Sequence, residues 1–106
     1  MPAPERRLIW SPEAEMDLQD IWRRGAKLFS AAMADTHLRD IRAAATRLTE
    51  FPLSGPARDS LFPGVRSLLI HPSVIFYRIA GADIEIVRVV DGRRNLAAIF
   101  RDDPGG

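Results

Sequence analysis

The sequence predicts an α+β fold, in which a helical hairpin packs on a mainly antiparallel sheet in the order β-α-α-β-β-β. Two segments with the apolar period of an amphipathic helix lie in the first half of the chain. Runs of alternating apolar and polar residues follow in the second half, separated by breaks short enough for hairpins. Each helix needs a cover for its apolar face, so we expect the helices to pack on each other and on the sheet.

A short strand is expected at residues 6–10, which read RRLIW, and Ser11-Pro12 ends it. Serine is a favourable N-cap and proline suits the first helical position, so a helix is predicted to begin here. Its apolar face is formed by Ala14, Leu18, Ile21, Trp22, Gly25 and Phe29. Gly25 weakens the helix locally, and we expect it to allow a second helix to approach closely.

The segment LFS, residues 28–30, interrupts this pattern, which then resumes until Pro52 stops the second helix. The apolar face of the second helix is formed by Ala34, Leu38, Ile41, Ala45 and Leu48. A break this short predicts an antiparallel helical hairpin. The residues expected to be largely buried between hairpin and sheet are Leu18, Ile21, Trp22, Leu38, Ile41, Leu48, Ile75, Ile84 and Ile86.

Residues 52–64, PLSGPARDSLFPG, are rich in proline and glycine and predict a loop. Three strands are expected after it, at Val65–His71, Val74–Ile79 and Ile84–Val90. The connections between them are short enough for antiparallel pairing. We expect one face of the sheet to pack on the helices and the other to be partly solvated.

The composition predicts one domain spanning residues 1–106, with a flexible tail at 101–106. There is no cysteine, which excludes thiol catalysis, disulfides and cysteine-ligated zinc. The opening residues MPAPERRLIW contain no long apolar run, so we expect a cytoplasmic protein without a membrane segment. The net charge of +1 is too small to indicate nucleic-acid binding by itself.

No catalytic, cofactor-binding or metal-binding residue is predicted. His37 falls on the second helix and His71 precedes a proline, and neither has a partner at the spacing of a metal site. The glycines are scattered at turns and match neither a P-loop nor a dinucleotide-binding motif. Both histidines are therefore expected to be surface or capping residues.

Arginine supplies all but one of the 15 basic residues, and several arginines recur on or just after the predicted strands. The candidate partner-binding residues are Arg66, Arg78, Arg88, Arg93 and Arg94. Arginine suits planar, bidentate contacts with carboxylates and phosphates, so these side chains could meet an acidic partner. The alternative is that they are ordinary solvated positions, neutralised within the chain by Glu85 and Asp91.

Four segments together resemble the ParE branch of the RelE/ParE toxin superfamily: WSPEAEMDLQDIW, RLTEFPLSGPARD, VRSLLIHPSVIFYRI and IEIVRVVDGRRNL. The resemblance covers about residues 6 to 100 and implies a helical hairpin on an antiparallel sheet. It also implies the toxin of a bacterial type II toxin–antitoxin system, held in a heteromeric complex by a ParD-like antitoxin. The implied target is DNA gyrase, and no direct sequence-specific binding of nucleic acid is expected.

Two alternatives stay open: a RelE-like endonuclease that cuts mRNA on the ribosome, and a degenerate member that only binds antitoxin. Phe100 stands where the nuclease branch has a catalytic tyrosine or histidine, and Asp91-Gly92 replaces the His-Gly frequent in ParE-like chains. Arg66 and Arg78 occupy positions that are basic in both branches and do not discriminate. We therefore interpret the arginines as a docking surface rather than a catalytic site.

An antitoxin tail is expected to lay an amphipathic helix on the helical hairpin and to bring carboxylates to the arginines. The strand edge near Val65–Ile70 is the second surface expected to contact it.

Overall fold

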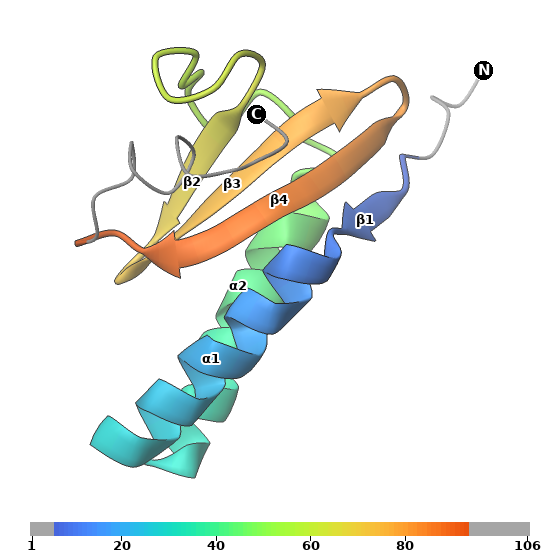
Figure 1. The fold of residues 1–106 in the computed structure, drawn as a ribbon. Coiled ribbons are helices and arrows are strands. Elements are labelled where there is room, and N and C mark those ends of the chain that lie inside the picture. The colour runs from blue at the N-terminus through green and yellow to red at the C-terminus, as the bar shows by residue number, and fades with distance from the viewer. Residues whose placement is uncertain (1–5, 94–106) are drawn as a thin grey trace.

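The computed structural model describes residues 6–93, and the expected tail at 101–106 lies outside that range. The elements are β1 (Leu8–Trp10), α1 (Pro12–Leu28), α2 (Ala31–Arg47), β2 (Arg66–Ile70), β3 (Ser73–Ala80) and β4 (Asp83–Asp91). They form a four-stranded sheet in the order β1-β4-β3-β2, in which β1 runs parallel to β4 and the other pairs are antiparallel (Figure 1). The predicted fold class is confirmed, and each of the last three strands matches its predicted bounds to within one residue.

Both helices begin at a serine that caps them. The hydroxyl of Ser11 accepts a hydrogen bond from the backbone N–H of Ala14 at 3.0 Å, and that of Ser30 accepts one from Met33 at 3.1 Å. Only two residues separate the helices, so they form the predicted antiparallel hairpin. A Cβ on Gly25 would lie 3.3 Å from the Cβ of Ala34, which confirms that this glycine permits close helix packing.

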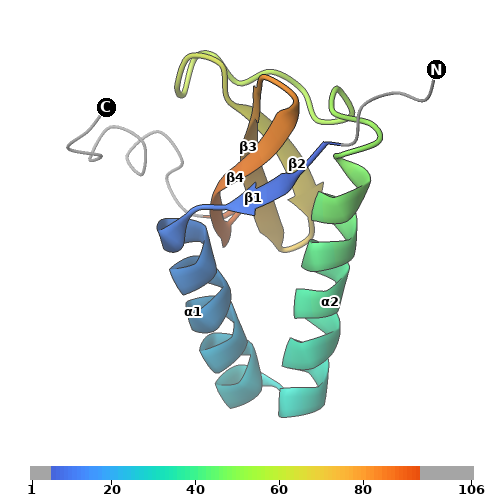
Figure 2. The ribbon, with the colours of Figure 1, turned by 90° about the vertical axis from the view of Figure 1, so that its right-hand side faces the viewer.

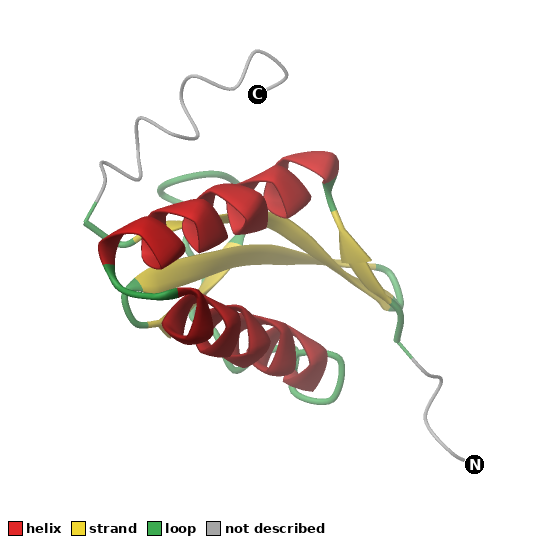
Figure 3. Cartoon of the chain, turned by 90° about the horizontal axis from the view of Figure 1, so that it is seen from below, coloured by secondary structure: helices red, strands yellow, loops and turns green. Residues whose placement is uncertain are grey.

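Both helices cover the same face of the sheet (Figure 3). The core between the two layers is formed by Ala14, Leu18, Ile41, Ala44, Ala45, Leu48, Ile75, Tyr77, Ile84, Ile86 and Val89. Of the predicted core residues, Ile21, Trp22 and Leu38 are only half-buried. The hairpin extends beyond the sheet, as Figures 1 and 2 show, so the ends of the helices away from the sheet have no strand to cover them. The indole N–H of Trp22 instead donates to Asp35 at 2.8 Å.

The second face of the sheet is buried at one end and solvated at the other. Val65, Val74, Phe76 and Val90 form a smaller buried cluster there. Leu61 and Phe62, from the loop after α2, pack against it. The expectation of a partly solvated face is confirmed: the loop returns over one end of it and buries the apolar side chains there, whereas Arg78 of β3 is exposed at the other end.

A β-bulge in β4 explains how its apolar residues reach the helix-facing core. Phe76 pairs with Arg88 and Tyr77 pairs with Ile86, which leaves Val87 as the extra residue. The bulge shifts the alternation by one position, so Val89 joins Ile86 in the core that faces the helices. Within residues 6–93, no helix is long and apolar enough to cross a membrane.

Candidate partner-binding site

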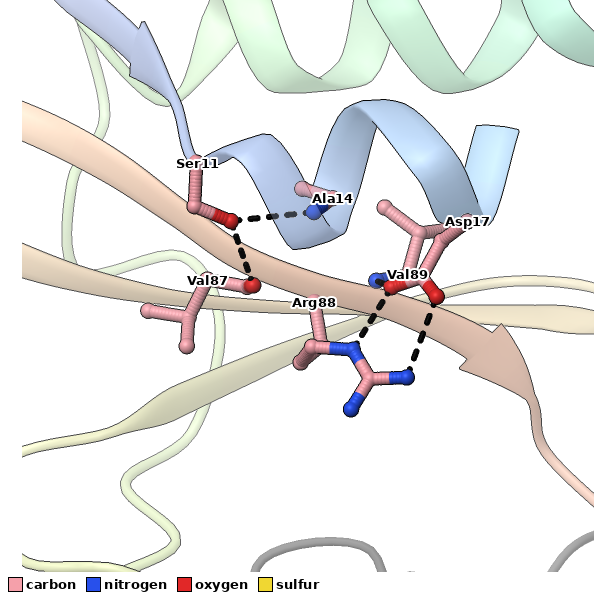
Figure 4. Close-up of polar contacts among 6 residues, drawn as sticks. All are labelled: Ser11, Ala14, Asp17, Val87, Arg88 and Val89. Atoms are coloured by element: carbon pink, nitrogen blue, oxygen red, sulfur yellow. Dashed lines mark hydrogen bonds and ion pairs between the residues drawn. The ribbon is translucent and has the colours of Figure 1, made fainter. Parts of the chain in front are cut away.

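The start of α1 covers the part of the β4 edge that β1 leaves open. Strand β1 pairs only with the first residues of β4. Farther along β4, backbone groups on the same edge contact the start of α1. The N–H of Ser11 donates to Ile86 O at 3.0 Å, and its hydroxyl donates to Val87 O at 2.8 Å (Figure 4). The carboxylate of Asp17 accepts from Val89 N at 2.9 Å. An open strand edge has unpaired backbone groups that another chain could bind. Here Ser11 and Asp17 form hydrogen bonds with those groups.

Asp17 also binds Arg88, the residue at the bulge. The guanidinium donates from Nε and Nη2 to the two carboxylate oxygens at 2.8 and 3.0 Å (Figure 4). The side chain of Arg88 is only 29% exposed and that of Asp17 15%. The alternative that Arg88 is an ordinary solvated position is therefore wrong. This arginine joins α1 to β4, and its replacement is expected to alter the fold as well as the surface.

Arg66 also binds within the chain, at the loop that follows α2. Its Nε donates to Gly55 O at 2.7 Å and its Nη2 to Leu53 O at 3.5 Å. The buried hydroxyl of Tyr77 donates to Pro52 O at 2.7 Å and accepts from Gly55 N at 3.0 Å. Arg66 and Tyr77 are register partners on neighbouring strands, so the two side chains hold the loop from the same face of the sheet.

Arg78 forms a cross-strand ion pair with Glu85. The two residues are direct register partners, and Nε and Nη2 donate to the carboxylate at 3.0 and 3.3 Å. Since Arg66 pairs with Tyr77, the residue before Arg78, the two arginines lie on opposite faces of the sheet. The predicted strand arginines therefore do not converge on one face, and Glu85 neutralises Arg78 as the alternative interpretation proposed.

Arg93 is the most solvent-accessible of the predicted binding residues that the structure describes. Its Nε and Nη2 donate to the carboxylate of Asp91 at 3.1 and 2.7 Å, and its backbone N–H donates to the same group at 2.9 Å. The Arg93 side chain is 84% exposed, whereas that of Asp91 is 21% exposed. These hydrogen bonds lower the pKa of Asp91 to about 2, and the positive charge of Arg24 on α1 contributes. Arg94 lies outside the described residues.

Sequence reasoning missed Arg24. The signal that points to it is the separation of charge along α1, in which acidic residues fill the first half and basic residues the second. The acidic set is Glu13, Glu15, Asp17 and Asp20, and the basic set is Arg23, Arg24 and Lys27. The charge of Arg24 contributes to the low pKa of Asp91 only in the folded chain, so this influence has no local sequence pattern.

Exposed apolar side chains lie on the helical hairpin, on the edge strand β2 and in the loop after α2, where Phe51 and Leu53 are exposed. Leu28, Phe29 and Met33 are all exposed at the tip of the hairpin, and we refer to them as the hairpin-tip patch. A shallow groove of about 300 Å³ adjoins it, lined by Ala32, Met33, Thr36, His37 and Asp40. In β2, the outermost strand opposite β1, the side chain of Leu69 is exposed.

His37, which lines this groove, is hydrogen-bonded within the chain. His37 Nε2 lies 2.8 Å from Ser73 Oγ, and Ser73 is buried, so this hydrogen bond joins α2 to the start of β3. His37 is therefore half-buried rather than the surface or capping residue that the sequence predicted, whereas His71 is exposed as expected. Over residues 6–93, no three histidines, aspartates or glutamates lie close enough together to hold a metal ion.

Comparison with known proteins identifies similar chains. Residues 8–96 match the family model described as ParE toxin of type II toxin-antitoxin system, parDE. Toxin ParE3 of Caulobacter vibrioides is 35% identical over 92 residues, which cover 87% of this chain and 92% of that protein. Toxin ParE1 of Mycobacterium tuberculosis is 32% identical over 91 residues, covering 85% and 93%.

Solved structures show the same fold. The chromosomal ParDE toxin–antitoxin system from P. aeruginosa contains a chain that superposes with a TM-score of 0.73 at 29% identity, covering 82% of this chain and 96% of that one. A chain of the toxin–antitoxin complex RelBE2 from Mycobacterium tuberculosis superposes with a TM-score of 0.52 at 19% identity, covering 83% and 99%. The second similarity concerns the fold alone.

Proposed function

The chain belongs to the ParE toxin family of type II toxin–antitoxin systems, and we propose that it inhibits DNA gyrase in the bacterial cytoplasm until a ParD-like antitoxin binds and neutralises it. The observation that favours a binding role over a catalytic one is that several polar side chains are already hydrogen-bonded within the chain. The carboxylates of Asp17, Glu85 and Asp91 are held by arginines, and the hydroxyl of Tyr77 is buried between loop backbone groups. General acid–base catalysis needs such groups open to a substrate. The tip of the helical hairpin instead exposes large apolar side chains, and the end of β4 exposes Arg93.

We place the antitoxin on the hairpin-tip patch and its adjoining groove. Leu28, Phe29 and Met33 are large apolar side chains left in solvent, and Met33 belongs to both the patch and the groove. An amphipathic helix that lies in this groove would bury them. The part of the β2 edge beside the exposed Leu69 is a second contact, where an extended segment would add a strand. The start of this edge is already taken, because Ala57 of the loop after α2 pairs with Arg66.

Co-expression with the product of the neighbouring gene, followed by size-exclusion chromatography, tests the antitoxin partner. We expect one co-eluting complex, and separate elution at micromolar concentration would contradict the proposal. Replacing Phe29 and Met33 together by serine should weaken binding about tenfold or more, because two apolar side chains lose their burial. Met16→Ser is the matched control, since Met16 is equally exposed on α1 but lies outside the hairpin-tip patch.

Purified toxin tests the target directly. We expect it to inhibit supercoiling by gyrase and to cause cleaved DNA to accumulate, and we expect the antitoxin to reverse both effects. Cleavage of mRNA on translating ribosomes, with supercoiling unaffected, would assign the chain to the nuclease branch instead. Binding of antitoxin without either activity would identify a degenerate member.

A further inference from the structure

The turn that follows α2 is fixed to the sheet by hydrogen bonds. The hydroxyl of Tyr77, a buried residue of β3, donates to Pro52 O at 2.7 Å. The guanidinium of Arg66 donates to Gly55 O at 2.7 Å and to Leu53 O at 3.5 Å. Gly55 is itself buried, and a Cβ on it would overlap the backbone of β2. The backbone of this turn is therefore held in place by the strands beneath it.

Two large apolar side chains of the turn nevertheless lie in solvent. Phe51 is 62% exposed and Leu53 is 69% exposed, and we refer to these two residues as the loop patch. The same loop packs Leu61 and Phe62 against the sheet, whereas the loop patch has no such cover. Apolar side chains on a fixed backbone lose little conformational freedom when a partner covers them, which favours binding.

Three arginines lie beside the loop patch. Arg66 donates to the backbone of Leu53, within the patch itself. Arg47 is an exposed residue in the last turn of α2, and its carbonyl oxygen accepts from Phe51 N at 2.9 Å. Arg6 donates to a backbone oxygen two residues before Phe51, at 3.4 Å. Positive charge therefore borders the apolar side chains.

These charges have no ion pair in the part of the chain that the structure describes. Between residues 6 and 93, none of the three arginines pairs with a carboxylate. Glu50 is the single acidic residue between Arg47 and Arg58 in the sequence. Unpaired cations also occur along the helices, as at Lys27 and Arg39, so charge alone does not select the site. The loop patch selects the site, and the arginines indicate the chemistry of its partner.

We propose that the loop patch is the surface by which this toxin binds its protein target, and that the target presents an apolar depression bordered by carboxylates. This inference rests on the proposed inhibition of gyrase, for which it names the contact surface on the toxin. Phe51 and Leu53 enter the depression, and Arg6 and Arg47 meet the carboxylates at its rim. The phosphates of duplex DNA would also attract the arginines but would leave the loop patch uncovered, so a protein partner fits better.

The surface proposed for the antitoxin lies at the other end of the hairpin. Figure 2 shows the tip of the hairpin and the loop after α2 at opposite ends of α2. This helix has 17 residues, which corresponds to a length of about 25 Å. Substitutions in the loop patch should therefore weaken binding of the target and leave binding of the antitoxin unchanged.

Binding of the full-length toxin to purified gyrase, measured by biolayer interferometry without antitoxin, tests the proposal. Replacing Phe51 and Leu53 together by serine should weaken binding about tenfold or more, because two apolar side chains lose their burial. Inhibition of supercoiling should then need a correspondingly higher concentration of toxin. Met16→Ser is the matched control, since Met16 is 64% exposed on α1 and belongs to neither patch, and it should bind as the wild type does.

Arg47→Gln tests the contribution of charge. We expect it to weaken binding about three- to tenfold at low salt, with a smaller effect at high salt. Arg39→Gln is the matched control, because Arg39 is exposed on the same helix and is also unpaired within residues 6–93, but precedes Arg47 by about two helical turns. It should leave the affinity unchanged. Circular dichroism checks that each variant keeps the fold.

The remaining outcomes separate this inference from the function on which it rests. If the wild type inhibits gyrase and the loop variants bind gyrase as the controls do, the loop patch is refuted while the proposed function stands. If the wild type neither binds nor inhibits gyrase, the proposed function fails and this inference fails with it. Loss of antitoxin binding in the folded loop variants would assign the patch to the antitoxin, and loss of affinity for duplex DNA with gyrase binding unchanged would assign it to phosphates. Either result would overturn the proposal.

Discussion

Replacing Asp17 by alanine tests the contact that joins α1 to β4. The carboxylate accepts three hydrogen bonds, two from the Arg88 guanidinium and one from Val89 N, all between 2.8 and 3.0 Å. Removing it leaves the Val89 N–H without its acceptor, which costs about 1–3 kcal/mol when the group is shielded from water. Loss of the partly buried ion pair adds to this. Removing one partner of a fully buried ion pair costs about 3–5 kcal/mol. Because Arg88 is partly exposed, we expect the cost for this pair to be smaller.

We therefore expect the free energy of unfolding to fall by about 2–4 kcal/mol in Asp17→Ala. Urea unfolding, followed by the fluorescence of the two tryptophans, measures it. Asp17→Asn separates the two contributions, because the amide oxygen still accepts from Val89 N while the charge is lost. We expect its effect to be about half that of the alanine variant.

Asp83→Ala is the matched control. Asp83 also receives two hydrogen bonds from an arginine, Arg7, but that pair lies at the solvent-exposed end of β4. Surface pairs of this kind contribute little, so the control should unfold near the wild-type midpoint. If Asp17→Ala unfolds as the control does, the reasoning that this edge contact stabilises the fold is refuted.

Three further predictions concern the core, the loop and the response to pH. Ile41→Ala should lower the unfolding free energy by about 2–5 kcal/mol because Ile41 is fully buried, and a melt unchanged from that of the exposed control Ile9→Ala would contradict the packing of α2. Gly55→Ala should destabilise by about 1–3 kcal/mol in urea unfolding, since its Cβ would overlap the carbonyl oxygen of Ser67; wild-type stability would mean that the loop lies elsewhere. The pKa of Asp91 is lowered to about 2, so its charge stabilises the fold above its unfolded pKa near 4, and this stabilisation is lost as the pH falls through about 2. Melting temperatures of wild type and Asp91→Asn should converge over that interval, and parallel curves would rule out this linkage.

The candidate site could be predicted only in part from the sequence. The sequence predicted Arg78, Arg88 and Arg93 as partner-binding residues, and that role stays a prediction. Their carboxylate partners within the chain are set by register and by packing. Arg66 looked like a surface cation and instead holds the loop through backbone carbonyls. Arg24 was missed because Asp91, whose pKa its charge helps to lower, lies far along the chain, and no local spacing relates the two.

The sequence by itself determined the helices, their serine caps, the short break between them and the position of the last three strands. These features follow from local propensity and from the period of apolar residues, which act within a few positions of the chain. The tertiary structure decided the parallel pairing of β1 with β4, the bulge at Val87, the partial cover of the second face and the ion pair between Asp17 and Arg88. The two residues of that pair are 71 positions apart, so they meet only when hydrophobic burial has packed α1 against the sheet.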